Sequence, residues 1–120
     1  MTGMLASVAS LNEASTLVPL SIDILDLKNP ALGALGALEL EEVHRIVGAF
    51  PDQCISATVG DLPMVPEVIL HAVMAMAQTG VDYVKIGFFE SASWQEVIEA
   101  LRPVAARGVK LVAVIFADQP

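Results

Sequence analysis

The sequence predicts an α/β protein with one parallel sheet of five strands joined by four helices. Short apolar runs alternate with segments of helical spacing along the chain, and strands that alternate with helices pair in parallel through right-handed crossovers. Hydrophobic residues make up 55% of the chain and charged residues 17%, as expected for strands buried on both faces. No linker interrupts the alternation, so residues 1–120 are predicted to form a single domain.

The predicted elements follow one another closely. Strands are expected at residues 4–8, 22–28, 54–59, 81–87 and 109–117, and helices at residues 12–18, 38–50, 66–79 and 93–107. Asn12 is the expected N-cap of the first helix, and Pro19 ends that helix. A capping box beginning at Ser93 starts the last helix, while Gly80 and Gly108 end the third and fourth helices.

Charge and cysteine content restrict the partners and the compartment. The formal net charge of −8 argues against nucleic acid or an anionic membrane as a partner, since both require a basic patch. The single cysteine, Cys54, excludes an internal disulfide and fits a reducing cytoplasm. Residues 1–10 lack a basic leader, and no apolar run approaches the roughly 20 residues of a membrane span. We therefore expect a cytoplasmic protein without a membrane partner.

Two lysines and one acid are the candidate chemical groups. Asp26 and Lys28 share one face at the exit of the second strand, where parallel α/β proteins place their active sites. Lys85 interrupts an apolar strand, which is costly unless its amine enters a polar pocket. A surface ion pair for the first two residues and an edge-strand lysine for the third remain alternatives. Otherwise the pattern predicts Schiff-base chemistry on a carbonyl substrate, with the acid transferring protons and phosphate held by loop amides and ammonium groups.

The third strand and one loop add candidate binding groups. Ser56 and Thr58 share a small, polar strand face that leaves room for a ligand, although hydroxyls that satisfy each other are an equal alternative. The glycine-containing loop at residues 29–37 brings backbone amides close to a ligand or serves as a plain connection.

Four motifs in order resemble one family closely. They are Asp26-Leu27-Lys28-Asn29-Pro30, then Gly33 with Leu35-Gly36-Ala37, then Ser56-Ala57-Thr58-Val59-Gly60-Asp61 with Pro63, and Asp82-Tyr83-Val84-Lys85-Ile86-Gly87. They resemble the (5-formylfuran-3-yl)methyl phosphate synthases, also called 4-(hydroxymethyl)-2-furancarboxaldehyde-phosphate synthases, of methanofuran biosynthesis. The resemblance extends from about Leu5 to Asp118.

The resemblance implies a lyase that condenses two molecules of glyceraldehyde 3-phosphate into a furan aldehyde phosphate, with loss of phosphate and water. It implies catalytic roles for Lys85, Lys28 and Asp26, and no cofactor or metal. The resemblance leaves open which lysine carries the imine, and we choose Lys85 because its strand neighbours enclose it better. We assign binding of the phosphorylated triose to residues at the strand ends and in the following loops: Ser7, Asn29, Gly33, Ser56, Thr58, Gly60, Asp61 and Gly87.

The resemblance also implies a TIM (β/α)8 barrel, of which this chain covers only about the first five strands. A closed barrel takes roughly 200 residues or more, and the family's later strands add another lysine and acid. We therefore expect exposed sheet edges and a homo-oligomer. A class I aldolase-like enzyme on phosphorylated sugars, and an inactive truncated remnant that functions through association, are the alternative functions.

Overall fold

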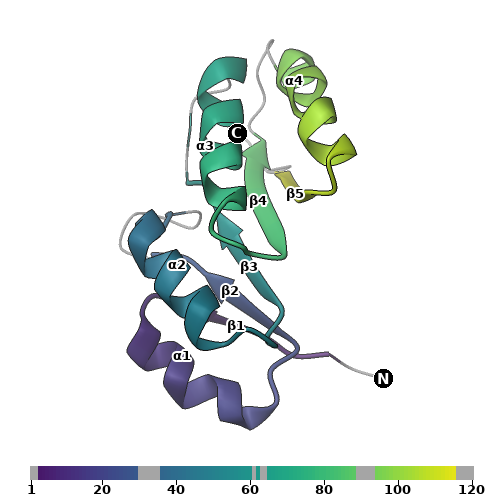
Figure 1. The fold of residues 1–120 in the computed structure, drawn as a ribbon. Coiled ribbons are helices and arrows are strands. Elements are labelled where there is room, and N and C mark those ends of the chain that lie inside the picture. Colours follow the sequence, from purple (N-terminus) through teal and green to yellow (C-terminus); the bar gives the residue numbers. More distant parts are fainter. Residues whose placement is uncertain (1–2, 30–35, 61, 63–64, 89–93, 116–120) are drawn as a thin grey trace, which may run out of the picture.

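The structure is a computed structural model that describes residues 3–29, 36–60, 62, 65–88 and 94–115 (Figure 1). Its elements are β1 (Leu5–Val8), α1 (Leu11–Leu17), the 3₁₀ helix η1 (Val18–Leu20), β2 (Ile24–Leu27), α2 (Leu40–Ala49), β3 (Ile55–Thr58), α3 (Pro66–Ala77), β4 (Tyr83–Phe88), α4 (Trp94–Ala106) and β5 (Lys110–Ile115). The predicted alternation of strands and helices is confirmed.

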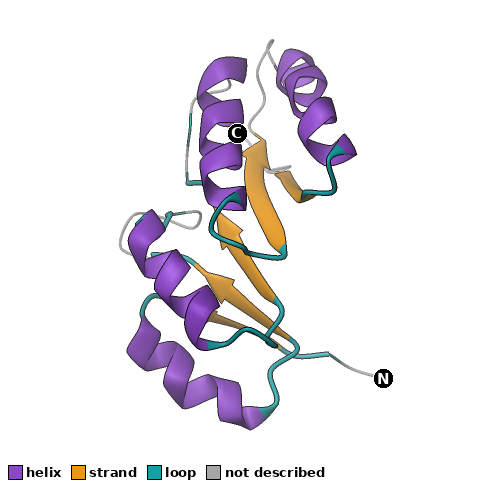
Figure 2. Ribbon diagram, viewed as in Figure 1, coloured by secondary structure: helices purple, strands orange, loops and turns teal. Residues whose placement is uncertain are grey.

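The strands form one parallel sheet in the order β1-β2-β3-β4-β5 (Figure 2). Every strand therefore lies beside its successor in the chain, and each crossover moves in the same direction across the sheet. Right-handed crossovers of this kind place all of their helices on one face. A doubly wound sheet would instead reverse its strand order and carry helices on both faces.

The apolar core confirms that the helices cover one face. Its strand residues come from only one of the two alternating sets: Val8, Leu25, Leu27, Ile55, Ala57, Val84 and Ile86. Its helix residues come from all four α-helices: Ala14, Val43, Ile46, Ile69, Val73, Met76, Val97, Leu101 and Val104. Because successive strand side chains point to opposite faces, the other set lies on a face that no described helix covers. We call this second surface the open face.

The beginning of α1 differs from the prediction, because Ser10 and not Asn12 is the N-cap. Ser10 Oγ accepts a hydrogen bond from the Glu13 amide at 3.2 Å, and Glu13 Oε1 accepts one from the Ala9 amide at 2.6 Å. This pairing resembles a capping box whose glutamate reaches one residue further back. Asn12 lies inside the first turn instead.

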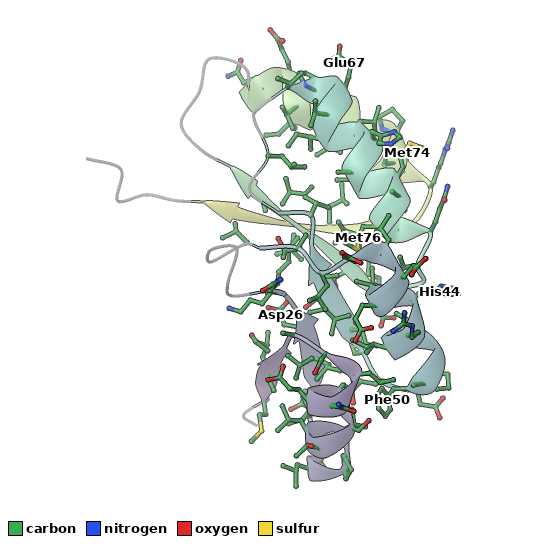
Figure 3. All side chains as sticks on the ribbon, turned by 90° about the vertical axis from the view of Figure 1, so that its left-hand side faces the viewer. Asp26, His44, Phe50, Glu67, Met74 and Met76 are labelled. Atoms are coloured by element: carbon green, nitrogen blue, oxygen red, sulfur yellow. The ribbon has the colours of Figure 1, made fainter. Side chains whose placement is uncertain are left out.

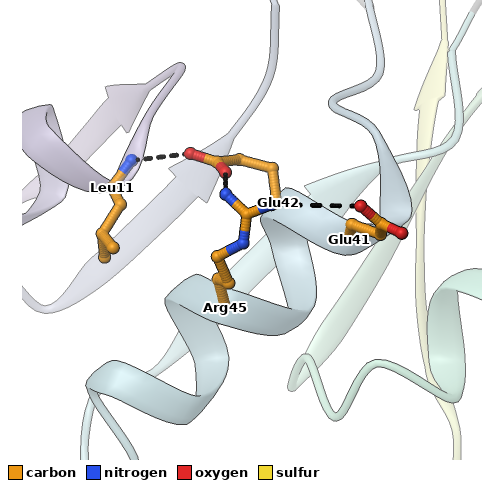
Figure 4. A network of polar contacts seen from close by, with 4 residues as sticks. All are labelled: Leu11, Glu41, Glu42 and Arg45. Carbon is orange, nitrogen blue, oxygen red and sulfur yellow. Dashed lines mark hydrogen bonds and ion pairs between the residues drawn. The ribbon is translucent and has the colours of Figure 1, made fainter.

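Glu42 joins the first turns of α1 and α2 (Figure 4). Its Oε2 accepts a hydrogen bond from the Leu11 amide at 3.0 Å, which satisfies one of the donors that an α-helix leaves unpaired at its start. Its Oε1 accepts a bond from Arg45 at 2.9 Å, and Arg45 also lies 3.9 Å from Glu41. The two helix starts are thus tied together at the carboxyl ends of their preceding strands.

The predicted strand limits extend beyond the observed ones because apolar residues flank the strands, and some of them, such as Cys54 and Val59, bond to the neighbouring strand just outside the assigned ends. Ile22, for example, is buried although β2 begins only at Ile24. Gly80 and Gly108 have φ angles of +95° and +96°, as helix-ending glycines do. The predicted cap Ser93 lies outside the described residues. In the part of the chain that the structure describes, no helix is long and apolar enough to cross a bilayer.

Candidate active site

Polar side chains form a stripe across the open face of β1 to β4. The strand register pairs Ser7 with Asp26, Asp26 with Ser56, and Ser56 with Tyr83, and it pairs Thr58 with Lys85. Residues paired in this way on neighbouring strands point to the same face of the sheet. Hydroxyls of β1 and β3 therefore lie on the same face as one carboxylate and one amine.

Asp26, which is labelled in Figure 3, is the centre of this cluster. Its Oδ1 accepts a hydrogen bond from Ser56 Oγ at 2.7 Å and lies 3.2 Å from Lys85 Nζ. Its Oδ2 accepts a longer bond from Ser7 Oγ at 3.4 Å. Donors from β1, β3 and β4 thus converge on a single side chain of β2.

The contacts of Asp26 account for its burial. The residue is 5% exposed, and a carboxylate so far from water is costly unless donors and an opposite charge surround it. Two hydroxyls and one ammonium fulfil that condition. Lys85 is the more accessible partner, with a side chain 21% exposed compared with 7% for that of Asp26.

Lys85 reaches Asp26 diagonally across β3. Its partner in the register is Thr58, whereas the partner of Asp26 is Ser56, two residues earlier on β3. The lysine side chain is long enough to span the intervening strand, and its Nζ comes to 3.2 Å from Asp26 Oδ1. The lysine predicted from an apolar strand therefore enters a polar site, and the edge-strand alternative does not apply, because β4 lies between β3 and β5.

Lys28 is placed less closely. Its backbone amide donates to the Val8 carbonyl at 3.1 Å, which continues the β1–β2 ladder one residue beyond β2. Strand alternation places it on the side of Asp26, and its residue is half-buried. Among the described residues its side chain has no ion-pair partner. The structure thus brings Asp26 and Lys85 into contact but leaves Lys28 as a neighbour.

The predicted binding residues are distributed along the same rim. The Asn29 amide donates to the Gly36 carbonyl at 2.7 Å and closes the loop between them. Gly60, at φ +94°, donates its amide to Thr58 Oγ1 at 3.3 Å. Gly87 is a buried residue of β4, two positions after Lys85 on the same face. Gly33 and Asp61 lie outside the described residues.

The sequence did not reveal that the serines bond to Asp26. Ser56 and Thr58 do not satisfy each other: the Ser56 hydroxyl donates to Asp26, while the Thr58 hydroxyl accepts from Gly60. The available signal was the alternation of side chains between the two faces of each strand. The register that places Ser56 opposite Asp26 depends on the folded sheet and is not visible in the sequence. The described residues include no group of three or more histidine, cysteine, aspartate or glutamate side chains that could hold a metal ion.

The amino end of the open face has a different character. Lys110 Nζ lies 5.4 Å from the centroid of the Tyr83 ring, and the register pairs these two residues at the start of β4 and β5. A lysine over an aromatic face is a common stabilising contact. Lys110 thus lies at the opposite end of the sheet from Gly60 and Gly87, as its place at the start of a strand predicts.

An amine beside a carboxylate can perform two linked steps. A deprotonated lysine amine can add to a carbonyl carbon, and the carboxylate can accept and return the protons that the addition displaces. Burial strengthens the interaction between the two groups because water screens them less than at an exposed surface.

The sequence matches the 4-HFC-P synthase family over residues 4–120. Among curated proteins, the (5-formylfuran-3-yl)methyl phosphate synthase of Methanopyrus kandleri is 37% identical over 100 residues, which cover 82% of this chain and 42% of that protein. The protein of the same name from Methanothermobacter thermautotrophicus is 34% identical over 122 residues, covering 96% of this chain and 51% of that protein. The chain therefore spans about half the length of the curated relatives that it matches.

A solved structure shares the fold without close sequence similarity. The crystal structure of CutC from Streptococcus agalactiae, a protein assigned to copper homeostasis, superposes with a TM-score of 0.75 at 17% identity, over 94% of this chain and 59% of that one. That likeness concerns the arrangement of strands and helices alone. The family match over nearly the whole sequence confirms the resemblance of the motifs, and it shows that the chain belongs to the 4-HFC-P synthase family.

Proposed function

We propose that this chain carries the catalytic lysine and acid of a (5-formylfuran-3-yl)methyl phosphate synthase of methanofuran biosynthesis. The reaction is the condensation of two glyceraldehyde 3-phosphate molecules into 4-(hydroxymethyl)-2-furancarboxaldehyde phosphate, with loss of phosphate and water. The observation that carries the proposal is the contact between Asp26 Oδ1 and Lys85 Nζ at 3.2 Å on the open face. Relatives that bear the synthase name support the same reaction.

The first chemical step is formation of an imine on Lys85. Asp26 takes a proton from the Lys85 ammonium, and the neutral amine adds to the carbonyl carbon of one triose phosphate. Asp26 then returns the proton to the resulting hydroxyl, which leaves as water while the carbon–nitrogen double bond forms. The protonated imine withdraws electrons from the adjacent carbon.

The second step is formation of a carbon–carbon bond. Asp26 removes a proton from the carbon next to the imine, and the enamine so formed attacks the carbonyl carbon of the second triose phosphate. The proton on Asp26 passes to the new alkoxide, so that the carboxylate is restored. Elimination of phosphate and water then completes the furan ring, and water hydrolyses the bond to Lys85, which releases the product and returns the free amine.

Lys28 is the alternative position for the imine, because it lies at the same strand end without an ion pair to a described residue. With the imine on Lys85, the Lys28 ammonium serves phosphate binding together with the strand-end residues assigned from the sequence. These residues are Ser7, Asn29, Gly33, Ser56, Thr58, Gly60, Asp61 and Gly87.

We further propose that the five strands are part of a closed (β/α)8 barrel. The strands run in consecutive parallel order with helices on one face, which is the arrangement of such a barrel. In this arrangement the open face becomes the barrel interior, and the other strands come from further residues or from another copy of the chain. Sedimentation velocity of the 120-residue chain tests association, and we expect a dimer or larger species. A compact monomer at micromolar concentration would contradict that expectation.

Reductive trapping tests the proposed imine. The protein is incubated with glyceraldehyde 3-phosphate and sodium borohydride, which reduces an imine to a stable secondary amine. Peptide mapping by mass spectrometry then locates the added mass, which we expect on Lys85. A sample treated with the sugar phosphate alone is the control, because an unreduced imine hydrolyses. An adduct on Lys28 would show that Lys28, and not Lys85, is the nucleophile. If no adduct depends on borohydride, the Schiff-base mechanism is refuted.

A further inference from the structure

We infer that Ser56 is a positioning residue that holds the Asp26 carboxylate so that Oδ1 serves proton transfer at Lys85 while Oδ2 removes the proton from the substrate carbon. The inference rests on the proposed function of the Asp26–Lys85 site. It also changes the role assigned to Ser56 from the sequence, which was binding of substrate phosphate.

The two carboxylate oxygens of Asp26 have different surroundings. Oδ1 accepts from Ser56 Oγ at 2.7 Å and faces Lys85 Nζ at 3.2 Å. Each oxygen of a carboxylate offers about two lone-pair positions, so both positions of Oδ1 are taken. This oxygen can exchange a proton with Lys85 but has no position left for a substrate.

Oδ2 is the available oxygen. Its contact with a described residue is the bond from Ser7 Oγ at 3.4 Å, near the upper limit for a hydrogen bond between two oxygens. Ser7 is an exposed residue of β1, so Oδ2 lies toward the accessible side of the cluster. A long bond of this kind is readily given up when a substrate carbon or hydroxyl approaches.

Ser56 itself is poorly suited to bind phosphate. The residue is 2% exposed, and its one hydroxyl hydrogen is already donated to Asp26. A phosphate could use that donor only by breaking a charge-assisted hydrogen bond, which is about twice as strong as a neutral one.

The backbone around Ser56 keeps the hydroxyl in place. The Leu25 amide donates to the Cys54 carbonyl at 2.9 Å, which fixes the β2–β3 register. The Ile55 amide donates to Asp82 Oδ2 at 2.8 Å, and the Asp82 amide donates to the Ile55 carbonyl at 2.8 Å, which ties β3 to the start of the β4 segment. Ser56 is therefore held from both sides, as a group that must orient another requires.

Steady-state kinetics of Ser56→Ala separate positioning from phosphate binding. A freed carboxylate rotates, so we expect kcat to fall by roughly 10- to 100-fold while the KM for glyceraldehyde 3-phosphate stays close to its original value. Loss of a phosphate ligand would instead raise KM with little change in kcat. A raised KM with unchanged kcat, or no change in either constant, would overturn the inference.

Thr79→Val is the matched control. Thr79 is 8% exposed, and its hydroxyl donates to the Met76 carbonyl at 2.6 Å at the end of α3, outside the polar cluster. This variant also removes a buried hydroxyl, so it lowers stability by the same kind of loss. Its kcat and KM should remain unchanged, which shows that a destabilised fold alone does not reproduce the effect of Ser56→Ala.

A double-mutant cycle tests the Ser56–Asp26 contact without requiring turnover. The urea midpoints of Ser56→Ala, Asp26→Ala and the double variant are compared with that of the unchanged chain. We expect the shift of the double variant to be clearly smaller than the sum of the single shifts, because the first substitution already removes the shared bond. Additive shifts would overturn the inference. If the unchanged protein shows no condensation activity, the proposed function fails, and the cycle still decides whether Ser56 holds Asp26.

Discussion

The two faces of the one sheet differ in chemistry, although the same strands build both. On the helix-covered face, Leu25, Ile55 and Val84 are at most 1% exposed and contact only the apolar core. On the open face, Asp26 and Ser56 occupy the alternating positions of the same strands. Residues that stabilise the apolar core and residues of the candidate active site therefore alternate along the same strands.

Burial alone does not distinguish the two faces. All four residues of β3 are buried, yet Ile55 and Ala57 belong to the apolar core while Ser56 and Thr58 belong to the open face. The difference lies in what each buried group requires. An apolar side chain needs close packing, whereas a hydroxyl or a charge needs a partner. In the described part of the chain, no buried side-chain nitrogen or oxygen lacks a partner.

The largest expected effect is on catalysis and comes from the open face. Lys85→Arg keeps the positive charge near Asp26 but removes a nucleophilic amine, because a guanidinium is not usefully deprotonated. We expect turnover to fall by at least about 10³-fold while the protein stays folded. Turnover is measured by the formation of the furan aldehyde phosphate, and folding by circular dichroism.

Lys110→Arg is the control for that prediction. Lys110 lies at the amino end of the sheet against Tyr83, and the same exchange of side chains there should leave turnover unchanged. Turnover retained by Lys85→Arg would show that Lys85 supplies only charge, and the imine would then have to form elsewhere.

A pair of adjacent substitutions tests the two faces for stability. Leu25→Ala removes a fully buried side chain from the helix-covered face, and we expect it to lower the free energy of unfolding by about 3 kcal/mol. Ile24→Ala removes a half-buried side chain from the open face and should cost about 1 kcal/mol. Urea unfolding measures both. The unequal costs are expected for the dissociated chain, and costs that become equal at protein concentrations where the chain associates would show that the open face is packed in the assembly, as the proposed barrel requires.

The parallel sheet could be predicted from the sequence because the alternation of apolar runs and helices is a local pattern. The consecutive strand order followed from the resemblance to a barrel family, since a doubly wound sheet shows the same alternation. Alternation along each strand groups Asp26 with Lys28 and Ser56 with Thr58, and the expected site at the carboxyl ends of the strands brings Lys85 to them. The hydrogen bond from Ser56 to Asp26 could not be predicted, because it depends on the register between two strands. The N-cap is predicted at Asn12 from residue type alone, whereas Ser10 is the cap because its hydroxyl accepts a hydrogen bond from the Glu13 amide, a contact that depends on the folded backbone.

Two glycines test how closely the helix-covered side is packed. Gly80 precedes β4 at φ +95°, and a Cβ there would lie 3.2 Å from Val47 Cγ1 on α2. Gly108 precedes β5 at φ +96° with no atom within 4 Å of such a Cβ. Replacing Gly108 by alanine should lower the free energy of unfolding by about 1 kcal/mol, because of the backbone conformation alone. Replacing Gly80 by alanine should lower it by about 2 kcal/mol, because the contact with Val47 adds to the same backbone effect. Thermal unfolding measures the difference, and equal costs would show that Val47 moves aside freely.

The smallest expected effect concerns Cys54, which directly precedes β3. Partial burial raises the pKa of the Cys54 thiol, the Asp82 carboxylate raises this pKa further, and the Lys110 ammonium lowers it. Only the thiolate reacts with iodoacetamide, so the folded protein should be modified more slowly at neutral pH than the same chain in urea. The raised pKa should slow the reaction further than burial of the sulfur against the reagent does by itself.

The direction of the pH dependence distinguishes a raised pKa of Cys54 from simple shielding. With a raised pKa, the rate for the folded protein keeps increasing at alkaline pH after the rate for the unfolded chain has levelled off, and the ratio of the two rates narrows. The unfolded state loses the thiol proton first, so the contribution of Cys54 to stability is complete below the unfolded pKa and is lost as pH rises toward the folded one. Shielding without a raised pKa would give a ratio of rates that does not change with pH.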